Sequence, residues 1–338
     1  MAAAHHQVWT GAQVVEVDVI AQRVRRIVLS PDRMQTPAAP GSHVDIAVEV
    51  HGRSEVRSYS VVDCGPRRNQ IVIGVQLAEP TRGGSASLHG MRPGQRVRIT
   101  EPLQNFPLGY GAPAYVLVAG GIGITALVAM GRALKTRGAD YRFVYAGRSR
   151  AAMAFADELV AEHGDRMDLH IGDEGGRIDI EALVAGVPPG GELYFCGPAP
   201  MLAAIQATWA RAGRRPADLR FETFGSGGRF DSEAFRLVIP RLGLETTVAG
   251  DVSMLEALES PGVEMMSDCR RGECGLCQIK VLEVRGVIDH RDVFLSEAQR
   301  QRNDRLQSCV SRVVGPPPVG GAGSHSHREP GTVSIDLP

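Results

Sequence analysis

The stretch CRRGECGLC, residues 269–277, decides the fold of the C-terminal third of this 338-residue chain. Four residues separate its first two cysteines and two residues separate the next pair, and Cys309 follows further along the chain. This spacing is the plant-type pattern of ligands to a [2Fe–2S] cluster, in which one tight loop supplies three thiolates and a distant strand supplies the fourth. The sequence therefore predicts a cluster site. Its predicted ligands are Cys269, Cys274, Cys277 and Cys309.

Two glycines in the same stretch, Gly272 and Gly275, allow the backbone conformations that such a loop requires. Three other interpretations must be weighed against a cluster. Cys274 and Cys277 form a CxxC pair, but the strand and helix that flank a thioredoxin-type pair are missing. A zinc site of four cysteines usually has two close pairs, whereas Cys309 has no neighbouring cysteine. Chance clustering is the third alternative, and the spacing favours the cluster over all three.

The composition describes a globular protein without a charge bias, with 43% hydrophobic residues, 22% charged residues and a formal net charge of −1. This charge provides no field for binding nucleic acid. No apolar run approaches the roughly 18 residues of a membrane-spanning helix. The first residues, MAAAHHQVWTG, do not resemble a secretion signal. Six cysteines are too few for a disulfide framework in a chain of this length, so their thiols predict a reducing compartment, the cytoplasm.

Three segments with different patterns follow one another, in keeping with two or three domains for this length. Residues 1–110 contain short runs rich in Val and Ile between turn dipeptides, and they predict a small antiparallel β-barrel. Residues 111–225 alternate apolar runs with helical stretches, and they predict right-handed βαβ units in an open parallel sheet. Residues 226–338 contain the four-cysteine region.

The third segment carries further local signals. A hairpin is predicted around Leu242 and Gly243, and Ser253 opens a capping box for a short helix. Residues 315–331, GPPPVGGAGSHSHREPG, predict a long loop, and its two histidines are interpreted as solvated rather than metal-binding. The final TVSIDLP alternates apolar and polar residues, and it predicts a last strand at the edge of a sheet.

A glycine-rich turn, AGGIGIT at residues 119–125, lies between an expected strand and an expected helix. Its glycines let the backbone approach a pyrophosphate, and the helix N-terminus adds N–H groups. The turn departs from the strict G-x-G-x-x-G pattern, so alone it also fits an ordinary strand–helix connection. A second motif, FCGPAPM at residues 195–201, closes what we expect to be the last strand of the sheet, at the edge where open α/β sheets bind ligands.

Two polar clusters stand out in the first segment. RSYS, residues 57–60, offers a guanidinium fork for a phosphate, an aromatic face and hydroxyl groups for ring N or O atoms. RGGSAS, residues 82–87, offers backbone N–H groups to a phosphate. Taken alone, the first cluster also fits an exposed strand edge and the second an ordinary turn.

Taken in this order, the five motifs resemble those of the phthalate dioxygenase reductase family, which includes vanillate demethylase-type reductases. RSYS and RGGSAS are similar to the family's flavin motif and flavin-phosphate turn. AGGIGIT and FCGPAPM are similar to its two pyridine-nucleotide motifs, and CRRGECGLC with Cys309 to its ferredoxin ligands. The resemblance extends from about Val14 to Leu337. The long loop at 315–331 departs from the family pattern and leaves open whether a partner docks in the family's manner.

The resemblance implies a flavin-binding β-barrel domain (1–110), an NAD(P)-binding α/β domain (111–225) and a plant-type ferredoxin domain of α+β β-grasp fold (226–338). It implies an NADH-dependent oxidoreductase, monomeric, that passes electrons to a partner. The implied cofactors are FMN, with FAD as the alternative, NADH, with NADPH as the alternative, and the [2Fe–2S] cluster. The implied partner is a Rieske-type aromatic oxygenase or demethylase. A haem or di-iron oxygenase as partner, and a redox-sensing iron–sulfur protein, are the alternatives.

The resemblance also implies roles for individual residues. The residues implied to bind the flavin are Arg57, Ser58, Tyr59, Ser60, Ile73, Gly74, Val75, Gly83, Gly84, Ser85 and Ala86. Those implied to bind the nucleotide are Gly121, Ile122, Gly123, Thr125, Arg148, Ser149, Cys196, Gly197 and Pro198. Those implied at the reacting centre are Ser60, Cys196 as a positioning residue, and Glu222. A 2′-phosphate could sit beside Arg148 and Arg150, but the family habit favours NADH.

Overall fold

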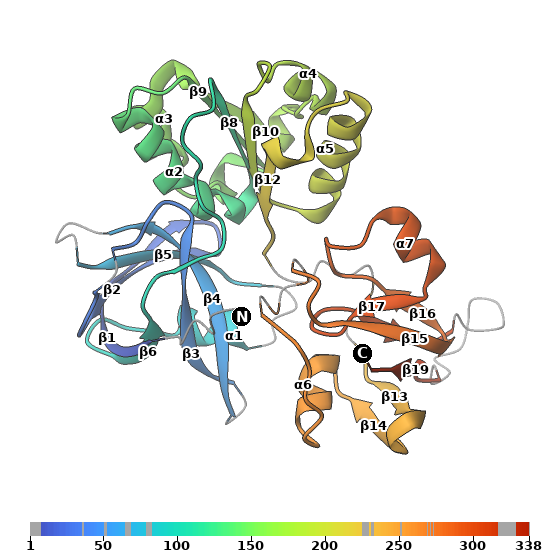
Figure 1. The fold of residues 1–338 in the computed structure, drawn as a ribbon. Helices are drawn as coiled ribbons and strands as arrows, with labels where there is room; N and C mark the ends of the chain where they lie inside the picture. The colour runs from blue at the N-terminus through green and yellow to red at the C-terminus, as the bar shows by residue number, and fades with distance from the viewer. Residues whose placement is uncertain are drawn as a thin grey trace. The chain divides into compact units, whose positions relative to one another are not determined.

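The computed structural model divides the chain into two compact units, Met1–Thr223 (unit 1) and Phe224–Pro338 (unit 2). It describes residues 8–35, 37–50, 53–64, 69–78, 83–224, 230, 233–250, 252–268, 270, 272, 274–316 and 329–337. Figure 1 draws the helices and strands of both units. The division into three domains at residues 110 and 225 stays a prediction.

The first part of unit 1 is a closed antiparallel β-barrel, as the Val- and Ile-rich runs predict. Its elements are β1 (Trp9–Ala21), β2 (Val24–Pro31), β3 (Ser42–Val50), β4 (Arg53–Asp63), β5 (Ile71–Gln76), α1 (Gly84–His89), β6 (Arg96–Thr100) and β7 (Leu103–Gln104). The strand order is β4-β5-β2-β1-β6-β3-β7, and the pairing of β4 with β3 closes the barrel. Alternate side chains such as Ile27, Ile46 and Ile73 fill its interior and are fully buried.

The second part of unit 1 is a five-stranded parallel sheet with helices on both faces. Its elements are β8 (Tyr115–Gly120), α2 (Ile124–Thr136), β9 (Tyr141–Gly147), α3 (Ala156–His163), β10 (Met167–Ile171), α4 (Ile180–Ala185), β11 (Glu192–Cys196), α5 (Ala199–Arg211) and β12 (Leu219–Glu222). The order is β10-β9-β8-β11-β12, and Figure 1 shows α2 and α3 on one face and α4 and α5 on the other. The prediction that the strand ending at Cys196 is the last was wrong. The four-residue β12 follows it at the edge and is too short and too polar to stand out as an apolar run.

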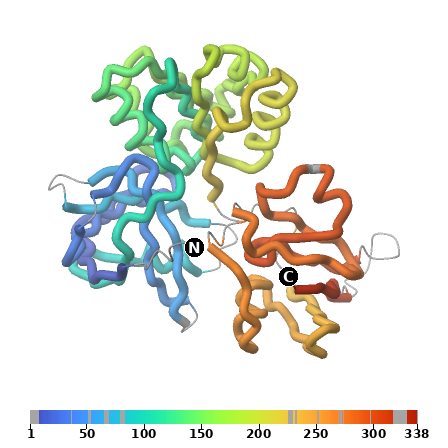
Figure 2. The backbone as a smooth tube through the Cα atoms, viewed as in Figure 1, coloured from blue at the N-terminus to red at the C-terminus, as the bar shows by residue number. Residues whose placement is uncertain are grey.

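One hydrophobic core joins the barrel to the parallel sheet within unit 1. Val28, Val62 and Val72 from the barrel belong to the same buried cluster as Ile124 and Leu127 of α2. Figure 2 follows the chain from the blue barrel strands into the green helices of this cluster. The shared core therefore holds β4 and β5 against α2.

Unit 2 is an α+β fold around a mixed five-stranded sheet of order β14-β13-β19-β15-β17, with a separate β16–β18 pair. Its elements are β13 (Phe235–Ile239), β14 (Leu244–Val248), α6 (Met254–Glu259), β15 (Gln278–Arg285), β16 (Val287–Asp289), α7 (Glu297–Arg302), β17 (Arg305–Gln307), β18 (Arg312–Val314) and β19 (Thr332–Asp336). The predicted hairpin turns at Gly243, whose φ is +59°, and Ser253 caps α6 through a complete capping box.

The alternating pattern of the last strand predicted a place at the edge of a sheet, and this prediction was wrong. β19 pairs with β13 on one side and β15 on the other, and both Val333 and Ile335 are fully buried. In Figure 2 the dark red end of the tube lies among the orange strands of the unit. Alternation reports which face is buried, not how many neighbours a strand has. Most of the loop before it, residues 317–328 with both of its histidines, lies outside the described residues.

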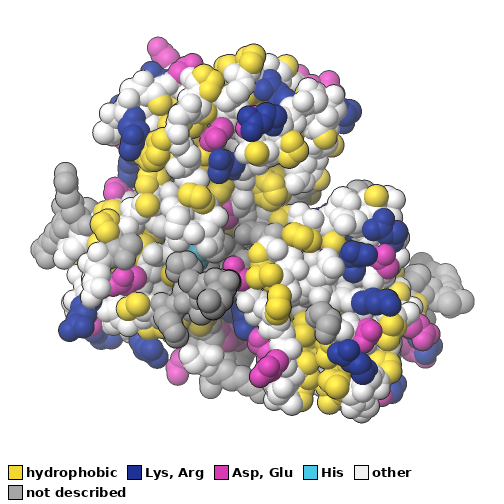
Figure 3. All heavy atoms as spheres, viewed as in Figure 1, with side chains coloured by type: hydrophobic (Ala, Val, Ile, Leu, Met, Phe, Trp, Pro, Cys, Tyr) yellow, Lys and Arg dark blue, Asp and Glu magenta, His cyan; other side chains and the backbone are white. Residues whose placement is uncertain are grey.

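The surface is mixed in charge. Figure 3 shows basic and acidic side chains interspersed over the visible face of each unit, in keeping with the net charge of −1. The two longest helices, α2 and α5, have 13 residues each, whereas a bilayer core requires about 20. Across the described residues, no helix is long and apolar enough to span a membrane.

Candidate functional site

Two sequence motifs meet at the carboxyl ends of neighbouring parallel strands. In the register of β8 and β11, Cys196 lies opposite Ala119. A Cβ atom on Gly123 would lie 2.2 Å from the carbonyl oxygen of Cys196, and one on Gly120 would lie 2.5 Å from Pro198 Cδ. Only glycine therefore fits at these two positions. The strand order reverses between β8 and β11, and open α/β sheets bind ligands at such a point.

The turn after β8 is open at one position. Gly121 adopts a φ of +55°, and apart from Gly121 itself and its chain neighbours no atom lies within 4 Å of its Cβ position. Thr125 Oγ1 donates to the Ile122 carbonyl oxygen at 2.9 Å, which closes the turn at the start of α2. A Cβ on Gly197 would lie 2.9 Å from the Gly120 Cα atom. The structure thus brings the two predicted nucleotide motifs together.

Barrel strand β5 meets the beginning of α2 at one point. A Cβ on Gly74 would lie 2.7 Å from Thr125 Cγ2 and 3.3 Å from the ring of Phe155. Ile73 and Val75 flank this glycine and are fully buried. The residues implied to line a flavin therefore lie beside those implied to bind a nucleotide.

A hydroxyl and a carboxylate from distant parts of unit 1 form a buried pair. Ser60 Oγ, on β4, donates to Glu222 Oε2, at the end of β12, over 3.4 Å. These residues are 5% and 2% exposed. In the register of β11 and β12, Cys196 lies opposite Glu222 and is fully buried. The three residues implied at the reacting centre thus occupy one region.

The predicted flavin-phosphate turn lies against an arginine. A Cβ on Gly84 would lie 2.6 Å from Arg57 Nε. Gly83 adopts a φ of +94°, and α1 begins with Gly84, Ser85 and Ala86. The Ser85 hydroxyl accepts from the backbone N–H of Ala78 at 3.1 Å. Because a guanidinium faces a turn that has no room for a side chain, the residues fit a phosphate group.

The other residues of the RSYS motif alternate along β4. Ser58 Oγ donates to Asp45 Oδ1 on β3 at 2.5 Å. Burial raises the pKa of Tyr59 to about 12, so its hydroxyl stays neutral. Arg57 also forms an ion pair with Glu55 on its own strand. The strand thus presents an aromatic ring, a cation and oriented hydroxyl groups.

Arg148 and Ser149 follow β9, next to the turn after β8. The backbone N–H of Asp173 donates to the Arg148 carbonyl oxygen at 2.9 Å. Arg150 makes two contacts with the Glu174 carboxylate, Nε–Oε1 at 3.3 Å and Nη2–Oε2 at 3.2 Å. Glu174 raises the pKa of Arg150. One of the two guanidinium groups considered for a 2′-phosphate is therefore paired with a carboxylate.

In unit 2 two of the four predicted cluster ligands converge. Cys277 Sγ and Cys309 Sγ are 3.1 Å apart and buried. This contact lowers the pKa of the Cys277 thiol, which favours the thiolate that binds iron. Cys274 lies on the same loop and is partly exposed, and Cys269 lies outside the described residues. Within the part of the chain described, no three His, Cys, Asp or Glu side chains gather as a metal site.

The loop between the cysteines is as tight as a cluster requires. Gly272 and Gly275 adopt φ values of +76° and +78°. A Cβ on Gly272 would lie 2.6 Å from Val310 Cγ2, and one on Gly275 would lie 2.3 Å from the ring of Phe294. The left-handed conformation favours glycine at both positions, and a side chain there would require Val310, Asp292 or Phe294 to move. The loop and the thiol pair fit a [2Fe–2S] cluster.

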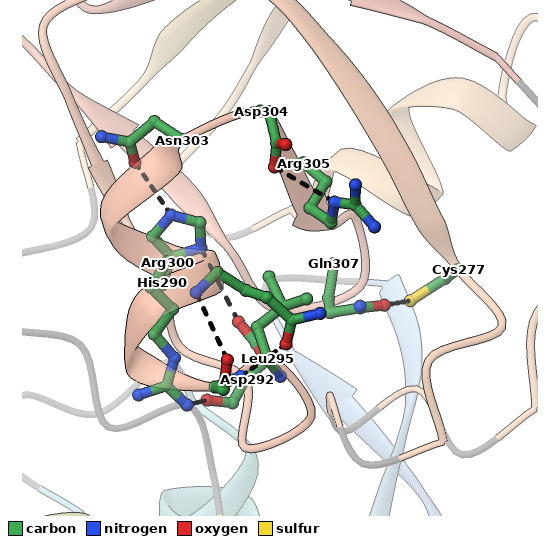
Figure 4. A network of polar contacts seen from close by, with 11 residues as sticks. Cys277, His290, Asp292, Leu295, Arg300, Asn303, Asp304, Arg305 and Gln307 are labelled. Carbon is green, nitrogen blue, oxygen red and sulfur yellow. Dashed lines mark hydrogen bonds and ion pairs between the residues drawn. The ribbon is translucent and has the colours of Figure 1, made fainter.

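A buried polar network beside this loop was missed by sequence reasoning. Figure 4 shows Gln307 pointing toward Cys277, whose Sγ lies 3.5 Å from Gln307 Oε1. Nearby, His290 Nε2 lies 3.0 Å from Asn303 Oδ1, and its Nδ1 lies 3.8 Å from Asp292 Oδ2. Buried amides and carboxylates follow no periodic pattern, so no signal in the sequence marks them.

Comparisons with known proteins extend over both units. A family model described as a 2Fe-2S iron-sulfur cluster binding domain matches residues 239–314. The phenoxybenzoate dioxygenase subunit beta of Ectopseudomonas oleovorans is 38% identical over 278 residues, which cover 81% of this chain and 85% of that protein. The heme-dependent oxidative N-demethylase beta subunit of Ectopseudomonas mendocina (strain ymp) is 37% identical over 278 residues, covering 82% of this chain and 87% of that one. The solved structure of phthalate dioxygenase reductase, described as a modular structure for electron transfer from pyridine nucleotides to [2Fe–2S], superposes with a TM-score of 0.75 at 26% identity. It covers 97% of this chain and 98% of that structure.

These likenesses confirm the predicted fold class of barrel, parallel α/β sheet and ferredoxin domain. They confirm the predicted set of cofactors, a flavin, a pyridine nucleotide and a [2Fe–2S] cluster, and an oxygenase as the kind of partner. Because the identity extends over 81% of the chain and the fold over 97% of it, the chain belongs to the phthalate dioxygenase reductase family, oxidoreductases that carry electrons from NAD(P)H through a flavin to a [2Fe–2S] cluster.

Proposed function

We propose that this chain takes a hydride from NADH onto FMN and passes single electrons through its cluster to a Rieske-type aromatic oxygenase or demethylase. The observation that carries the proposal is the approach of Gly74 to Thr125, which lies where the flavin strand meets the nucleotide turn. Hydride transfer requires the two rings to lie in contact, and a shared core that holds β5 against α2 supports that contact.

We assign the flavin to β4, β5 and α1, with the residues predicted from the family resemblance. The contact between Arg57 and Gly84 supports one phosphate position beside the turn, where the phosphate would share the Arg57 guanidinium with the Glu55 carboxylate. A single phosphate is what FMN presents. No segment of the sequence suggests an adenosine-binding extension for FAD, so we assign FMN.

NADH supplies two electrons as a hydride, and the flavin converts them into single electrons for the cluster, which is the cofactors' own chemistry. The chain orients the reactants. Because the Ser60 hydroxyl donates its proton to Glu222 Oε2, its oxygen keeps lone pairs that can accept from a ring N–H. Burial of both residues excludes water from that place. Cys196 acts by packing and not as a nucleophile, since it is fully buried in the core.

We assign the nucleotide to the turn after β8 and the end of β11, and we propose NADH as the preferred coenzyme. The Arg150–Glu174 pair supports this preference, because a carboxylate already neutralises a guanidinium that a 2′-phosphate would need. Asp157 and Asp173 add two further negative charges near the same arginine.

We assign the cluster to Cys269, Cys274, Cys277 and Cys309. A Rieske-type partner is the first candidate, supported by the dioxygenase name of the relative from Ectopseudomonas oleovorans. A haem oxygenase is the second candidate, since a relative of nearly equal identity is named as a subunit of a heme-dependent N-demethylase. We further propose that the chain acts as a monomer in the cytoplasm, in keeping with its cysteines, and sedimentation of the purified protein tests the first point.

An anaerobic titration of the purified protein with NADH, followed by its visible spectrum, tests the relay. The proposal expects the flavin and the cluster bands to bleach together, with about three electrons taken up per chain, two by the flavin and one by the cluster. Bleaching of the flavin without the cluster would contradict the relay. Mixing the reduced protein with a Rieske-type oxygenase and with a haem oxygenase then separates the two partners by the faster reoxidation of the cluster.

A further inference from the structure

Gln307 is a fully buried amide beside a candidate cluster ligand. It ends β17, two residues before Cys309, and its backbone pairs with Gln278, the neighbour of Cys277. Its exposure is 0%, and its Oε1 lies 3.5 Å from Cys277 Sγ (Figure 4). Its Nε2, in contrast, has no hydrogen-bond partner among the described residues.

Apolar surroundings strengthen the effect of the Gln307 amide dipole on the neighbouring sulfur. The apolar cluster around the two thiols consists of Leu255, Cys277 and Cys309, with Met265 and Val310 packed against it. In such surroundings a hydrogen bond to sulfur is weakened little by solvent.

The backbone of Cys277 is held in place independently of Gln307. The N–H and the hydroxyl of Ser308 both donate to the Cys277 carbonyl oxygen, at 3.1 and 2.9 Å. A change of the Gln307 side chain therefore leaves this anchor intact.

Iron binding would change Cys277 Sγ from a hydrogen-bond donor to an acceptor toward Gln307. In the contact present here the Cys277 thiol donates to the amide oxygen. A cysteine that binds iron is a thiolate, which can only accept. The amide oxygen and nitrogen exchange places by a half-turn about the last side-chain torsion, which is broad and roughly two-fold. The half-turn points an unused N–H at the thiolate.

We propose that Gln307 sets the reduction potential of the cluster by donating a hydrogen bond from Nε2 to the Cys277 thiolate. Reduction adds one electron, converts one Fe(III) to Fe(II) and makes the cluster more negative. A donor to sulfur stabilises that charge and raises the potential. Gln307 is a positioning residue in this role, and its effect favours electron flow from the flavin. The inference rests on the proposed assignment of Cys277 as a ligand.

The test compares the full-length holoprotein with Gln307→Leu, which removes the donor, and with Gln307→Glu, which can only accept while ionised. Spectroelectrochemistry measures the midpoint potential of the cluster. We expect Gln307→Leu to keep the cluster. Its equilibrium constant for reduction should fall at least threefold, which lowers the midpoint potential by about 28 mV for one electron. Gln307→Glu should lower it further. Gln301→Leu, on the exposed surface of the same unit, is the matched control and should leave the potential unchanged.

An unchanged or raised potential in Gln307→Leu would overturn the proposal. A second measurement does not depend on how the variants fold. In the reduced wild type labelled with side-chain ¹⁵N-glutamine, pulsed EPR should detect a nitrogen coupled to the cluster, and its absence would also refute the inference. Cys277→Ser tests the underlying assignment. A cluster spectrum unaffected by that change refutes Cys277 as a ligand, whereas an altered spectrum together with an unshifted Gln307→Leu refutes the role of Gln307 alone.

Discussion

The two units hold their candidate sites by different means. In unit 1, distant parts of the chain meet: Ser60 and Glu222 are 162 residues apart, and Gly123 packs against the backbone of Cys196. In unit 2, the paired thiols of Cys277 and Cys309 are 32 residues apart, one at the end of the cysteine loop and the other in the turn after β17. The site of unit 1 is thus assembled from segments spread over the whole unit, whereas unit 2 takes three of its four proposed ligands from one loop.

The difference is clearest in what excludes a side chain at each glycine. At Gly123 the obstacle is the carbonyl group of Cys196, which belongs to the parallel sheet. At Gly275 it is the ring of Phe294, which is 47% exposed. A sheet carbonyl cannot move without breaking strand pairing, but an exposed ring can rotate. We therefore expect the turn of unit 1 to tolerate substitution less than the loop of unit 2.

The strongest test of this contrast is Gly123→Ala. Its φ is −58°, so the substitution acts through the clash with the Cys196 carbonyl rather than through backbone strain. We expect the overpacking to lower the free energy of unfolding by about 1–3 kcal/mol or more and to displace the bound nucleotide. Reduction of the flavin by NADH, measured by stopped flow, should slow by about 100-fold. The cluster spectrum should not change.

Gly90→Ala is the matched control for that test. Gly90 also lies in unit 1, and its Cβ would come no closer than 3.4 Å to another atom. Equal losses in the two variants would show that the close approach of β8 and β11 is not what the nucleotide site needs.

The corresponding change in unit 2 is Gly275→Ala. A left-handed alanine costs about 1–2 kcal/mol, and that strain remains even when the Phe294 ring moves away. We expect the cluster to be lost to an iron chelator about tenfold faster. Adding Phe294→Ala should recover only the part due to the clash. Full recovery in the double variant would show that the left-handed conformation of Gly275 is unimportant.

The sequence predicted best those residues that act through the backbone. Gly123, Gly272 and Gly275 lie at tight turns, where glycine tolerates close approach or a positive φ better than other residues. A glycine within a motif therefore predicts such a position directly from the sequence. The cysteine spacing likewise encodes the loop. Such features are local, so one segment suffices to predict them.

What the sequence did not predict depends on contacts between distant segments. Gln307 and Glu174 have no motif, since a glutamine becomes notable only when it is buried beside a thiol, and a glutamate only when it neutralises a particular arginine. The central place of β19 is another example, because its pattern does not tell which strands pair with it.

A smaller effect is expected from Glu222→Gln, which keeps the shape of the buried pair but removes its charge. The Ser60 hydroxyl then loses a charge-assisted bond of about 1 kcal/mol. We expect the rate of flavin reduction by NADH to fall about fivefold. The potential of the cluster should not change, because Glu222 is not one of the proposed cluster ligands.

A double-mutant cycle that combines Glu222→Gln with Ser60→Ala shows whether Ser60 and Glu222 act as a pair. If Ser60→Ala and Glu222→Gln act together, the double variant should be about as slow as the slower single variant. Fully additive losses would show that each residue acts alone, and the assembly of unit 1 from distant segments would then lack this functional link.

The smallest effect concerns the coenzyme. Glu174→Gln removes the charge that pairs with Arg150, and exposed pairs of this kind contribute about 0.2–1 kcal/mol. The freed guanidinium should improve kcat/KM for NADPH about threefold and leave that for NADH nearly unchanged. Glu181→Gln, which breaks a similar exposed pair with Arg211 on α4 and α5, is the matched control. If both variants favour NADPH equally, the preference reflects overall charge. If neither does, the ribose end of the nucleotide does not reach Arg150, and the specificity of unit 1 lies in its backbone turns alone.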